Sequence, residues 1–548
     1  MDIDRAQNAY RAILDDHPSE DVLHLPNRRA KSQRSLVETI VKRFHPEMEW
    51  RQGSQVYDAN RKKAKMAWLQ KIESQKKPHK SRRRPLFPWK GQLEEPVSLK
   101  GPLARPMPVQ IPKTVDPFLP INDYIASNAA VADHPNVEMD PFSNTQMVQF
   151  KRGIVYSDGR LDLCKQVLGP LWIVCLLKAL ANNHHIKHFL IGNNVVSSSG
   201  ALAIAKFIRD FPDRIETWYL AGCHITSAVF STLVDAMVDS PVITNVWLKR
   251  NPLGPESVPA LVKLITQGQN LRTLDLENTE LGDEGVQSLM DALAEFSTPI
   301  HLKNLYLNAN GIGVDGLAAI VRFLESPRCQ LEALFISSNP IGDDGIVQFT
   351  PRTFHSCPSL QILSAQSCGL TSRGIKLLAY SITVAKNLKT LHLGLSKTAR
   401  PMGQFHNYFD ASSIPAFKYM IENTPSLRAL TLDTMDVSYD ELQDLLKPVI
   451  DREGASLVSL RVRGRDRAGL CLEVKEALRE NRARLYGAKI DTKRFEDTQE
   501  AHALHNIEDI KLIDSYYRNA GRSCDMKQYW DDGDPDWQLV LDDVAQNA

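Results

Sequence analysis

The sequence lacks a hydrophobic run long enough to cross a membrane. Its most apolar stretch, residues 171–177, is followed directly by Lys178, whereas a membrane-spanning helix needs about 20 apolar residues. The first residues also lack a basic segment followed by an apolar one, so we expect no secretory signal. The 66 Lys and Arg nearly balance the 65 Asp and Glu, which is ordinary for a soluble globular protein. We therefore expect no membrane association and interpret residues 171–177 as a buried helix.

Motifs that mark common catalytic and nucleotide-binding sites are absent as well. The sequence has no G-x-x-x-x-G-K-[ST] phosphate loop, no G-x-S-x-G nucleophile turn and no H-E-x-x-H zinc motif. Three histidines, His184, His185 and His188, lie close together, but no Cys or carboxylate stands nearby at the spacing that zinc ligands need. The sequence therefore predicts a protein that is not an enzyme and that holds no metal ion or cofactor.

Cysteine is scarce, and the eight cysteines form no pairing framework. Cys223 and Cys368 fall at a repeated position that is usually Asn, and Cys175 falls on an apolar helical segment. Disulfides are typical of oxidising compartments, whereas thiols stay reduced inside the cell. We expect reduced thiols and an intracellular protein, located in the cytoplasm and, as an open alternative, in the nucleus.

What the sequence does contain is a repeat of the form apolar-x-x-apolar-x-apolar-x-x-Asn. Successive copies begin 28 to 31 residues apart, which leaves room in each for a strand, a turn and a helix. Clear copies begin at Ile186, Ile215, Ile243, Leu271, Leu302, Leu331 and Leu360, weaker ones at Leu388, Leu427 and Leu457, and a divergent first copy runs through Leu161 and Leu163. A fixed period of this length predicts a solenoid.

Each repeat divides into a strand and a helix. Residues 285–296 and 316–324 show the apolar pattern of a helix. In the first segment the apolar residues at helical spacing are Val286, Leu289, Met290 and Leu293. The apolar positions of the strand point inward and the residues between them point outward. The Asn can donate and accept hydrogen bonds, so we expect it to satisfy backbone groups where the chain turns. Three repeats have another residue at this position, which can form fewer of these hydrogen bonds, namely Cys223, Thr279 and Cys368.

These repeats resemble the ribonuclease-inhibitor-like leucine-rich-repeat proteins over roughly residues 155–470. The resemblance implies an α/β horseshoe solenoid, with a parallel sheet on the concave face, helices outside, and partner binding on the concave face or its rims. We divide the chain into a small helical segment (1–75), a basic and then proline-rich linker that is largely extended (76–152), about 11 repeats (153–468), and a helical, acidic C-terminal tail (469–548). The N-terminal region is expected to be partly disordered.

A row of outward-facing residues marks the expected binding surface. Each is the residue between the second and third apolar positions, and neighbouring strands lie about 4.8 Å apart. The row reads Leu190, Tyr219, Trp247, Asp275, Tyr306, Phe335, Ser364, His392, Thr431 and Arg461. Aromatic side chains are enriched at binding hot spots. Two alternatives remain open, namely that the rings only pack on one another, or that a flanking segment of this chain covers them.

One repeat is longer than its neighbours. Leu427 begins 39 residues after Leu388, and the extra residues fall in 397–410, between strand and helix. Insertions in solenoids often lie on the binding face. We therefore add Arg400, His406 and Tyr408, together with Phe409, to the expected partner-binding residues, with a tolerated surface loop as the alternative.

The function predicted from these features is a non-enzymatic scaffold that binds a protein partner through the concave face. The alternative is a regulator of a small GTPase, because Ran GTPase-activating proteins share this repeat type. That family places an arginine in a loop after an early strand, whereas residues 221–227 contain none, which leaves Arg250 as the nearest candidate.

Charged segments flank the repeats. Residues 61–90 carry 12 Lys and Arg against one acid, Glu73, and the C-terminal end is rich in Asp. A basic run of this kind indicates a nuclear import signal, a phosphate contact to RNA, or a solvated linker. No RNA-binding fold signature accompanies it, so we do not expect nucleic acid as the main partner.

Overall fold

A computed structural model describes residues 118–140, 145–166, 168–194, 196–394, 396, 407–451, 456–464 and 470–486. They fall into two compact units, one ending at Glu280 and the other beginning at Leu281. We call residues 118–280 the N-terminal unit and residues 281–486 the C-terminal unit. None of the described helices is both long enough and apolar enough to cross a membrane.

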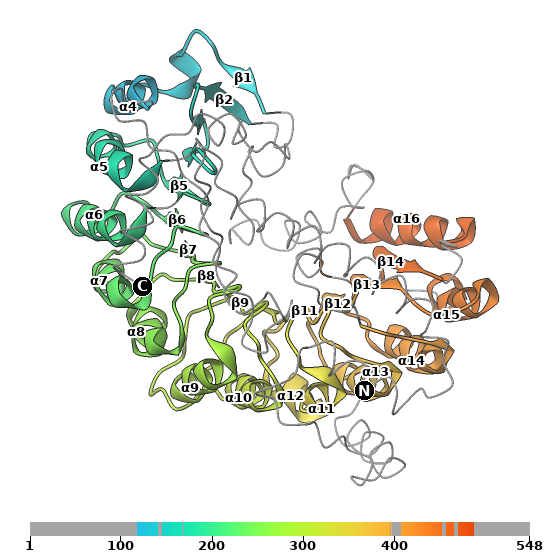
Figure 1. The fold of residues 1–548 in the computed structure, drawn as a ribbon. Helices are drawn as coiled ribbons and strands as arrows, with labels where there is room; N and C mark the ends of the chain where they lie inside the picture. The colour runs from blue at the N-terminus through green and yellow to red at the C-terminus, as the bar shows by residue number, and fades with distance from the viewer. Residues whose placement is uncertain are drawn as a thin grey trace, which may run out of the picture. The chain divides into compact units, whose positions relative to one another are not determined.

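The N-terminal unit begins with an antiparallel sheet and continues as parallel repeats (Figure 1). Its strands are β1 (Glu138–Met139), β2 (Gln146–Gln149), β3 (Ile154–Tyr156), β4 (Arg160–Asp162), β5 (His188–Leu190), β6 (Thr217–Tyr219), β7 (Asn245–Trp247) and β8 (Thr273–Asp275). Its helices are α4 (Leu119–Ala126), η3 (Val131–Asp133), α5 (Gly169–Leu180), α6 (Ser197–Asp210), α7 (Ser227–Val238), η4 (Pro255–Ser257) and α8 (Val258–Gln267).

The C-terminal unit consists of parallel strands and the helices between them. Its strands are β9 (Asn304–Tyr306), β10 (Ala333–Phe335), β11 (Ile362–Ser364), β12 (Thr390–His392), β13 (Ala429–Thr434) and β14 (Ser459–Arg463). Its helices are α9 (Gly282–Ala294), α10 (Val314–Glu325), α11 (Gly342–Ile346), α12 (Pro351–Ser356), α13 (Ser372–Ile382), η6 (Ala411–Ser413), α14 (Ile414–Asn423), α15 (Tyr439–Asp451) and α16 (Leu472–Tyr486). The helices predicted from residues 285–296 and 316–324 are confirmed as α9 and α10.

The structure differs from the prediction in two ways. Part of the range 76–152, predicted as an extended linker, is folded, and the sheet begins with antiparallel strands although a parallel sheet was predicted. From Phe118 onward that range forms α4, η3, β1 and β2, and residues before Phe118 lie outside the described part. The strands β1 to β4 pair antiparallel because their connections are short. Between β3 and β4 the turn needs Gly159, whose φ is +84° and whose position would bring a side chain against the carbonyl of His185.

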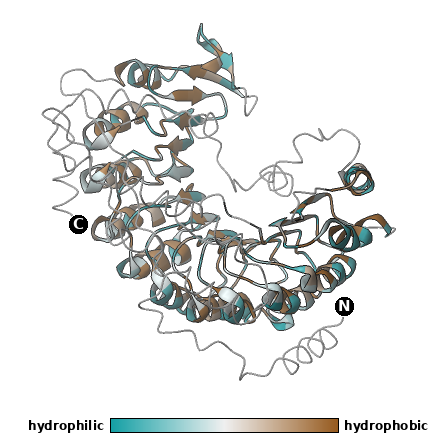
Figure 2. Ribbon diagram, turned by 45° about the vertical axis from the view of Figure 1, so that its right-hand side comes forward, coloured by the Kyte–Doolittle hydropathy of each residue, from teal (hydrophilic) through white to brown (hydrophobic). Residues whose placement is uncertain are grey.

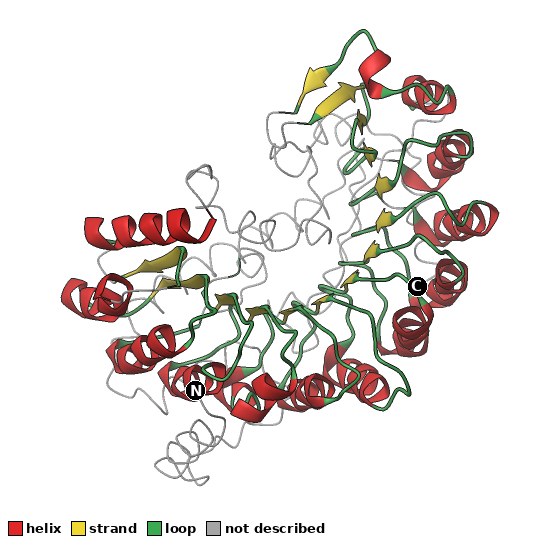
Figure 3. Cartoon of the chain, turned by 180° about the vertical axis from the view of Figure 1, so that it is seen from behind, coloured by secondary structure: helices red, strands yellow, loops and turns green. Residues whose placement is uncertain are grey.

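In each unit the helices lie on one side of the sheet, and the opposite side is called the sheet face below (Figures 1 and 3). The core lies between sheet and helices, where the repeated apolar residues are almost completely buried, as Phe189 and Trp218 are. Their rings meet edge to face with centroids 5.5 Å apart. Figure 2 shows polar and apolar residues alternating along the helices, as expected for helices packed on one side.

The repeated asparagines form a hydrogen-bond ladder at the turn after each strand. Asn339 accepts from the backbone N–H of Asn310 and Ile312 at 2.8 and 3.1 Å. Its amide donates to the carbonyls of Leu307 and Ile336 at 3.0 and 2.8 Å. Asn251 makes the equivalent four bonds in the N-terminal unit. The predicted role of the Asn, satisfying backbone groups of its own and the preceding repeat, matches this geometry.

Cysteine at the same position makes fewer hydrogen bonds to the backbone than asparagine does, as expected. The thiols of Cys223 and Cys368 each lie 3.3 Å from the carbonyl of the preceding repeat. Burial raises the pKa of both thiols to about 12, so they stay protonated and can donate. Thr279 donates to the carbonyl of Leu276 at 2.8 Å. All seven cysteines of the described residues have free thiols.

The long repeat keeps the ladder by using a different asparagine. Asn407 accepts from the N–H of Cys368 and Leu370 at 2.9 and 3.0 Å, and donates to the carbonyls of Ala365 and Leu393 at 2.8 and 2.7 Å. The extra residues therefore lie between the third apolar residue, Leu393, and the Asn of the repeat. They interrupt the repeat motif itself rather than the connection from the motif to the helix.

Candidate functional site

The predicted row of outward residues is in register in each unit. In the N-terminal unit Leu190 pairs with Tyr219, Tyr219 with Trp247, and Trp247 with Asp275 on adjacent strands. In the C-terminal unit the same register runs in the order Tyr306, Phe335, Ser364, His392, Thr431 and Arg461. The row therefore lies side by side on the sheet face of each unit. Whether it binds a partner stays a prediction.

Tyr219 and Trp247 lie on the sheet face of the N-terminal unit but are only 2% and 3% exposed. Their ring centroids are 6.0 Å apart with an angle of 40° between the planes. The Tyr219 ring lies so close over Gly192 that any side chain there would collide with it. Both rings are therefore buried within the chain, and their part in partner binding stays a prediction.

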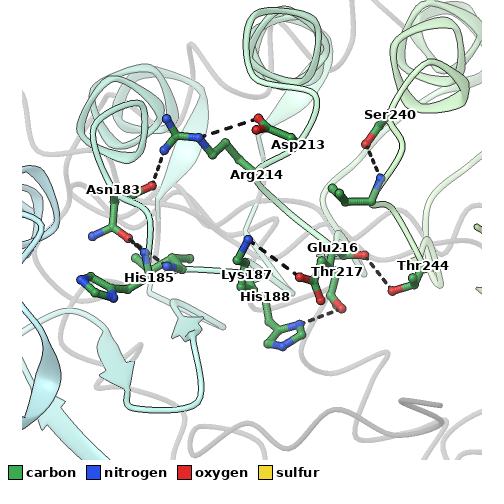
Figure 4. Close-up of polar contacts among 12 residues, drawn as sticks. Asn183, His185, Lys187, His188, Asp213, Arg214, Glu216, Thr217, Ser240 and Thr244 are labelled. Atoms are coloured by element: carbon green, nitrogen blue, oxygen red, sulfur yellow. Dashed lines mark hydrogen bonds and ion pairs between the residues drawn. The ribbon is translucent and has the colours of Figure 1, made fainter. Parts of the chain in front are cut away.

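A row of polar side chains runs beside the aromatic row, two residues earlier on each strand (Figure 4). His188 Nδ1 lies 2.9 Å from the Thr217 hydroxyl, which also accepts from the Asn245 amide at 3.3 Å. At the edge of the same strands, Lys187 and Glu216 form an ion pair at 3.9 Å. His188 is therefore held by a structural hydrogen bond, and Figure 4 shows its ring pointing toward Thr217.

Burial is the main cause that lowers the pKa of His188 below its ordinary value of 6.5. Arg160 and Lys187 lower it further, whereas Glu216 and Asp158 oppose them. Because the folded pKa lies below the unfolded one, the unfolded state binds more protons as the pH falls through this range. The stability contribution of neutral His188 is therefore complete above pH 6.5 and is lost as the pH falls toward the folded pKa.

We expect His188→Asn to reduce the pH dependence of stability, because the amide can keep a hydrogen bond to Thr217 but cannot titrate. The measurement is the drop in melting temperature between about pH 7.5 and about pH 5.5, in the natural sequence and in the variant. His355→Asn, on an exposed part of α12, serves as the control. An equal drop in all three proteins would contradict the role of His188.

Charged side chains border the aromatic pair. Lys249, two residues after Trp247, lies 3.6 Å from Glu277. Burial disfavours the Lys249 ammonium, but the attraction of Glu277, Tyr219 and Asp275 outweighs it and raises the pKa of Lys249. Asp275 accepts a hydrogen bond from the Glu277 N–H at 2.9 Å. Asp275, a predicted site residue, is thus 4% exposed and takes part in a local charge network.

Arg250, the candidate arginine of the GTPase alternative, lies in the turn after β7. Its guanidinium donates to the Asn193 side chain, two repeats earlier along the chain. An arginine that stabilises developing charge on a GTPase must extend its guanidinium to the bound partner. Arg250 could do so only after its hydrogen bond to Asn193 is broken. The small GTPase stays a prediction.

The sheet face of the C-terminal unit carries an apolar cluster of four side chains, Tyr306, Ala333, Phe335 and Ile362. The rings of Tyr306 and Phe335 are stacked with centroids 4.1 Å apart and planes within 1° of parallel. Phe335 is 9% exposed, and Tyr306 is half-buried. Beyond the cluster, the hydroxyls of Ser337 and Ser364 lie 2.9 Å apart. We call these four residues the apolar cluster.

The last predicted residues of the row are polar and paired. His392 Nδ1 lies 3.0 Å from the Thr431 hydroxyl, and His392 is 6% exposed. The Arg461 side chain is 47% exposed and forms an ion pair with Asp433 at 2.6 Å. Asp433 fills the space beside Gly394, where a side chain would collide with it. Arg461 is thus the most exposed member of the row in this unit.

The predicted residues of the long repeat separate into three groups. Arg400 and His406 lie outside the described residues. Tyr408 is half-buried, and its hydroxyl donates to the Asp436 carboxylate. Phe409 is fully buried and meets Phe417 edge to face at 5.4 Å. Phe409 therefore belongs to the core, and its assignment to a binding loop is wrong.

Sequence reasoning missed the partners of the aromatic residues. Ala333 and Ile362 stand two residues before the outward position, and side chains two apart on a strand share a face, so the same repeat alignment could have identified them. Asn407 gave no such signal, because its distance from the strand differs from that of every other ladder asparagine. Among the described residues, no group of three or more His, Cys, Asp or Glu side chains could hold a metal ion.

Strand-and-helix repeats joined by an asparagine ladder define an α/β solenoid of leucine-rich repeats. The repeats of this chain are similar to those of the ribonuclease-inhibitor-like leucine-rich-repeat proteins, which is the type predicted from the sequence. The family model described as "Leucine Rich repeat" matches residues 269–290, which cover the strand β8 and the first part of α9.

Curated relatives include two ribonuclease inhibitors. The chain is similar to the protein of Sus scrofa, with 24% identity over 247 residues, and to that of Mus musculus, with 26% over 253 residues. The alignments cover 40% and 41% of this chain and 54% of each relative, so the chain spans about half the length of these relatives. The human NACHT, LRR and PYD domains-containing protein 7 is 30% identical over 156 residues, which cover 28% of this chain and 16% of that protein.

Among solved structures, the chain is similar to the leucine-rich-repeat-containing protein LegL7 from Legionella pneumophila. The identity is 14%, the TM-score is 0.31, and the match covers 59% of this chain and 88% of that one.

Proposed function

We propose that this chain is a non-enzymatic interaction protein that holds a protein partner on its sheet face. The observation that carries the proposal is the apolar cluster of Tyr306, Ala333, Phe335 and Ile362. These residues stand on β9, β10 and β11, at strand positions that alternate with the residues facing the helices. Apolar side chains gathered away from the main core are typical of surfaces that bury area against another polypeptide.

The arrangement around the cluster also suits a protein ligand. Half-buried Tyr306 offers a ring and a hydroxyl, a combination that is enriched at binding hot spots. The next residue of the row, Ser364, pairs in register with Phe335 and bonds the Ser337 hydroxyl at 2.9 Å, so polar groups border the cluster on this side. By their name, the ribonuclease inhibitors inhibit a ribonuclease, which is a protein target. A protein partner for this chain is the corresponding proposal.

We expect Tyr306→Ala together with Phe335→Ala to weaken capture of the partner by tenfold or more, as truncation of hot-spot rings costs about 2 kcal/mol or more. The tagged full-length chain and the variant are compared by affinity capture and quantitative mass spectrometry. Leu202→Ala, on the exposed side of α6 in the other unit, is the control and should capture the partner normally. A folded double variant that captures the same proteins in the same amounts would refute binding through this face.

A further inference from the structure

The turns that lead from a helix to the next strand bond the turn of the preceding repeat. Ser326 donates to the carbonyl of Ala294 at 3.0 Å in the C-terminal unit. Ser240 donates in the same way to the carbonyl of Pro212 in the N-terminal unit. In both places a hydroxyl group therefore links two neighbouring repeats.

Two neighbouring turns of the C-terminal unit meet through thiols instead. Cys329 follows α10 and Cys357 follows α12, so the two residues stand 28 positions apart in successive repeats. Cys357 stands three residues before the first apolar position of its repeat, which is the position of Ser240 in an earlier repeat. A thiol is a weaker hydrogen-bond donor than a hydroxyl. Linking the turns by a hydrogen bond therefore does not require cysteine at this position.

The geometry of the two thiols suits the formation of a disulfide. Their sulfur atoms lie 4.0 Å apart, and a disulfide bond is about 2.05 Å long, so the sulfurs must approach by about 2 Å. Rotation about the Cα–Cβ bonds can supply this movement. The turns hold the two backbones in place, since the N–H groups of Cys329 and Cys357 donate to the carbonyls of Ser326 and Thr353, each at 3.1 Å.

The surroundings of Cys357 stabilise its thiolate. The Cys329 S–H donates to the Cys357 sulfur, the Ser359 hydroxyl lies 3.5 Å away, and the N–H of Leu360 contributes as well. Together these groups lower the pKa of Cys357 to about 7, although burial opposes them. The same hydrogen bond to Cys357 raises the pKa of the Cys329 thiol. The thiolate is the nucleophile of a thiol pair, so Cys357 is the attacking group and Cys329 is the second thiol.

Exposure and charge distinguish this pair from other thiols of the chain. Cys329 is half-buried and Cys357 is 3% exposed, which favours a small oxidant over a bulky one. Burial raises the pKa of Cys223 and Cys368 to about 12. Those two thiols therefore stay protonated and should react far more slowly.

We propose that Cys329 and Cys357 form a redox-active dithiol site, which a hydroperoxide converts reversibly to a disulfide joining two neighbouring repeats. The Cys357 thiolate attacks one oxygen of hydrogen peroxide and the O–O bond breaks, which leaves a sulfenic acid on Cys357. The released hydroxide takes up the proton that Cys357 had lost and becomes water. The Cys329 thiol then attacks the sulfenic sulfur, and a second water leaves as the S–S bond forms.

The reaction is balanced by the peroxide alone, since two thiols are oxidised to a disulfide while one hydrogen peroxide is reduced to two waters. The site goes beyond the proposed function and does not depend on it.

Peptide mapping of the full-length chain, before and after treatment of the reduced protein with hydrogen peroxide, tests the proposal. Free thiols are blocked with iodoacetamide, and trypsin then cuts after Arg328, Arg352 and Arg373. Cys329 lies on peptide 329–352 and Cys357 on peptide 353–373. We expect the linked form of these peptides to rise about tenfold or more over the untreated chain, and dithiothreitol to restore both thiols.

Serine variants separate the roles of the two thiols. Cys329→Ser lacks the second thiol, so the sulfenic acid on Cys357 should accumulate and be trapped by dimedone. Cys357→Ser should form no linked peptide, and its turn should be preserved because Ser240 occupies the same position in an earlier repeat. Cys175→Ser, on α5 of the other unit, is the matched control and should form the link as the natural chain does.

The decisive result comes from the natural chain, so it does not depend on the folding of any variant. Peptides that stay unlinked after peroxide treatment overturn the proposal. A link through Cys368, which shares peptide 353–373 and is distinguished by fragment ions, also overturns it. The capture experiment with the Tyr306 and Phe335 variant is carried out under reducing conditions. Its failure would refute the proposed function and leave the mapping result unchanged.

Discussion

Replacing Asn339 with Ala is expected to lower the free energy of unfolding by roughly 3–5 kcal/mol, because all of its buried side-chain hydrogen bonds are lost at once. The side chain is fully buried, accepts from two N–H groups of the preceding repeat, and donates to the carbonyls of Leu307, Ile336 and Ser337. Alanine leaves these backbone groups without a partner in a site that excludes water. The shift in the midpoint of urea denaturation, followed by circular dichroism, measures the effect.

Two further substitutions make this test specific. Asn339→Cys should fall between alanine and the natural residue, since Cys368 in the next repeat keeps one donor to a carbonyl at 3.3 Å. Asn387→Ala removes a single exposed hydrogen bond, to Pro358, and should change stability by about 0.5 kcal/mol or less. If Asn339→Ala and Asn387→Ala unfold at the same midpoint, the ladder does not stabilise this protein.

Phe409→Ala should destabilise the C-terminal unit by about 3–5 kcal/mol, the usual cost of removing a large buried ring. Phe409 is fully buried, and its ring packs against the ring of Phe417. In the sequence it stands two residues after the ladder residue Asn407. The loss arises from the cavity left behind and from the lost burial of apolar area. Thermal and urea denaturation of the full-length chain measure it.

The neighbouring substitution Tyr408→Phe is the matched control. It removes only the hydroxyl that donates to Asp436 and should cost about 1 kcal/mol. If Phe409 instead served on a binding loop, its replacement would weaken capture of a partner and leave the denaturation midpoint unchanged. That result would contradict the core position of this ring.

The fold of the repeats was predictable because the apolar spacing within each repeat indicates its strand and its helix. The apolar spacing of Leu302, Leu305 and Leu307 identifies a strand with two inward residues, and a helical apolar stripe follows. Once the strand positions are aligned, parallel pairing in register follows, and Tyr306 must stand beside Phe335, as observed. The role of the ladder asparagines was predictable for the same reason, since their position in the repeat is constant.

The candidate site was only partly predictable. The order of the outward residues could be read from the repeats, but their exposure could not, because burial depends on what lies over the sheet rather than on the strand. Arg250 shows the same difficulty, since its partner Asn193 is 57 residues earlier in the sequence. The structure also reassigned Phe409, because a residue beyond an insertion can return to the core.

By itself the sequence determined the repeat architecture, the inward and outward positions, and the role of the asparagines in satisfying backbone groups, since all of these follow from local periodicity. Only the tertiary structure decided how deeply Tyr219 and Trp247 are buried, how each aromatic pair is angled, and that Asn407 continues the ladder after the insertion. These features depend on contacts between repeats, and such contacts are set by packing in three dimensions rather than by the pattern within any one repeat.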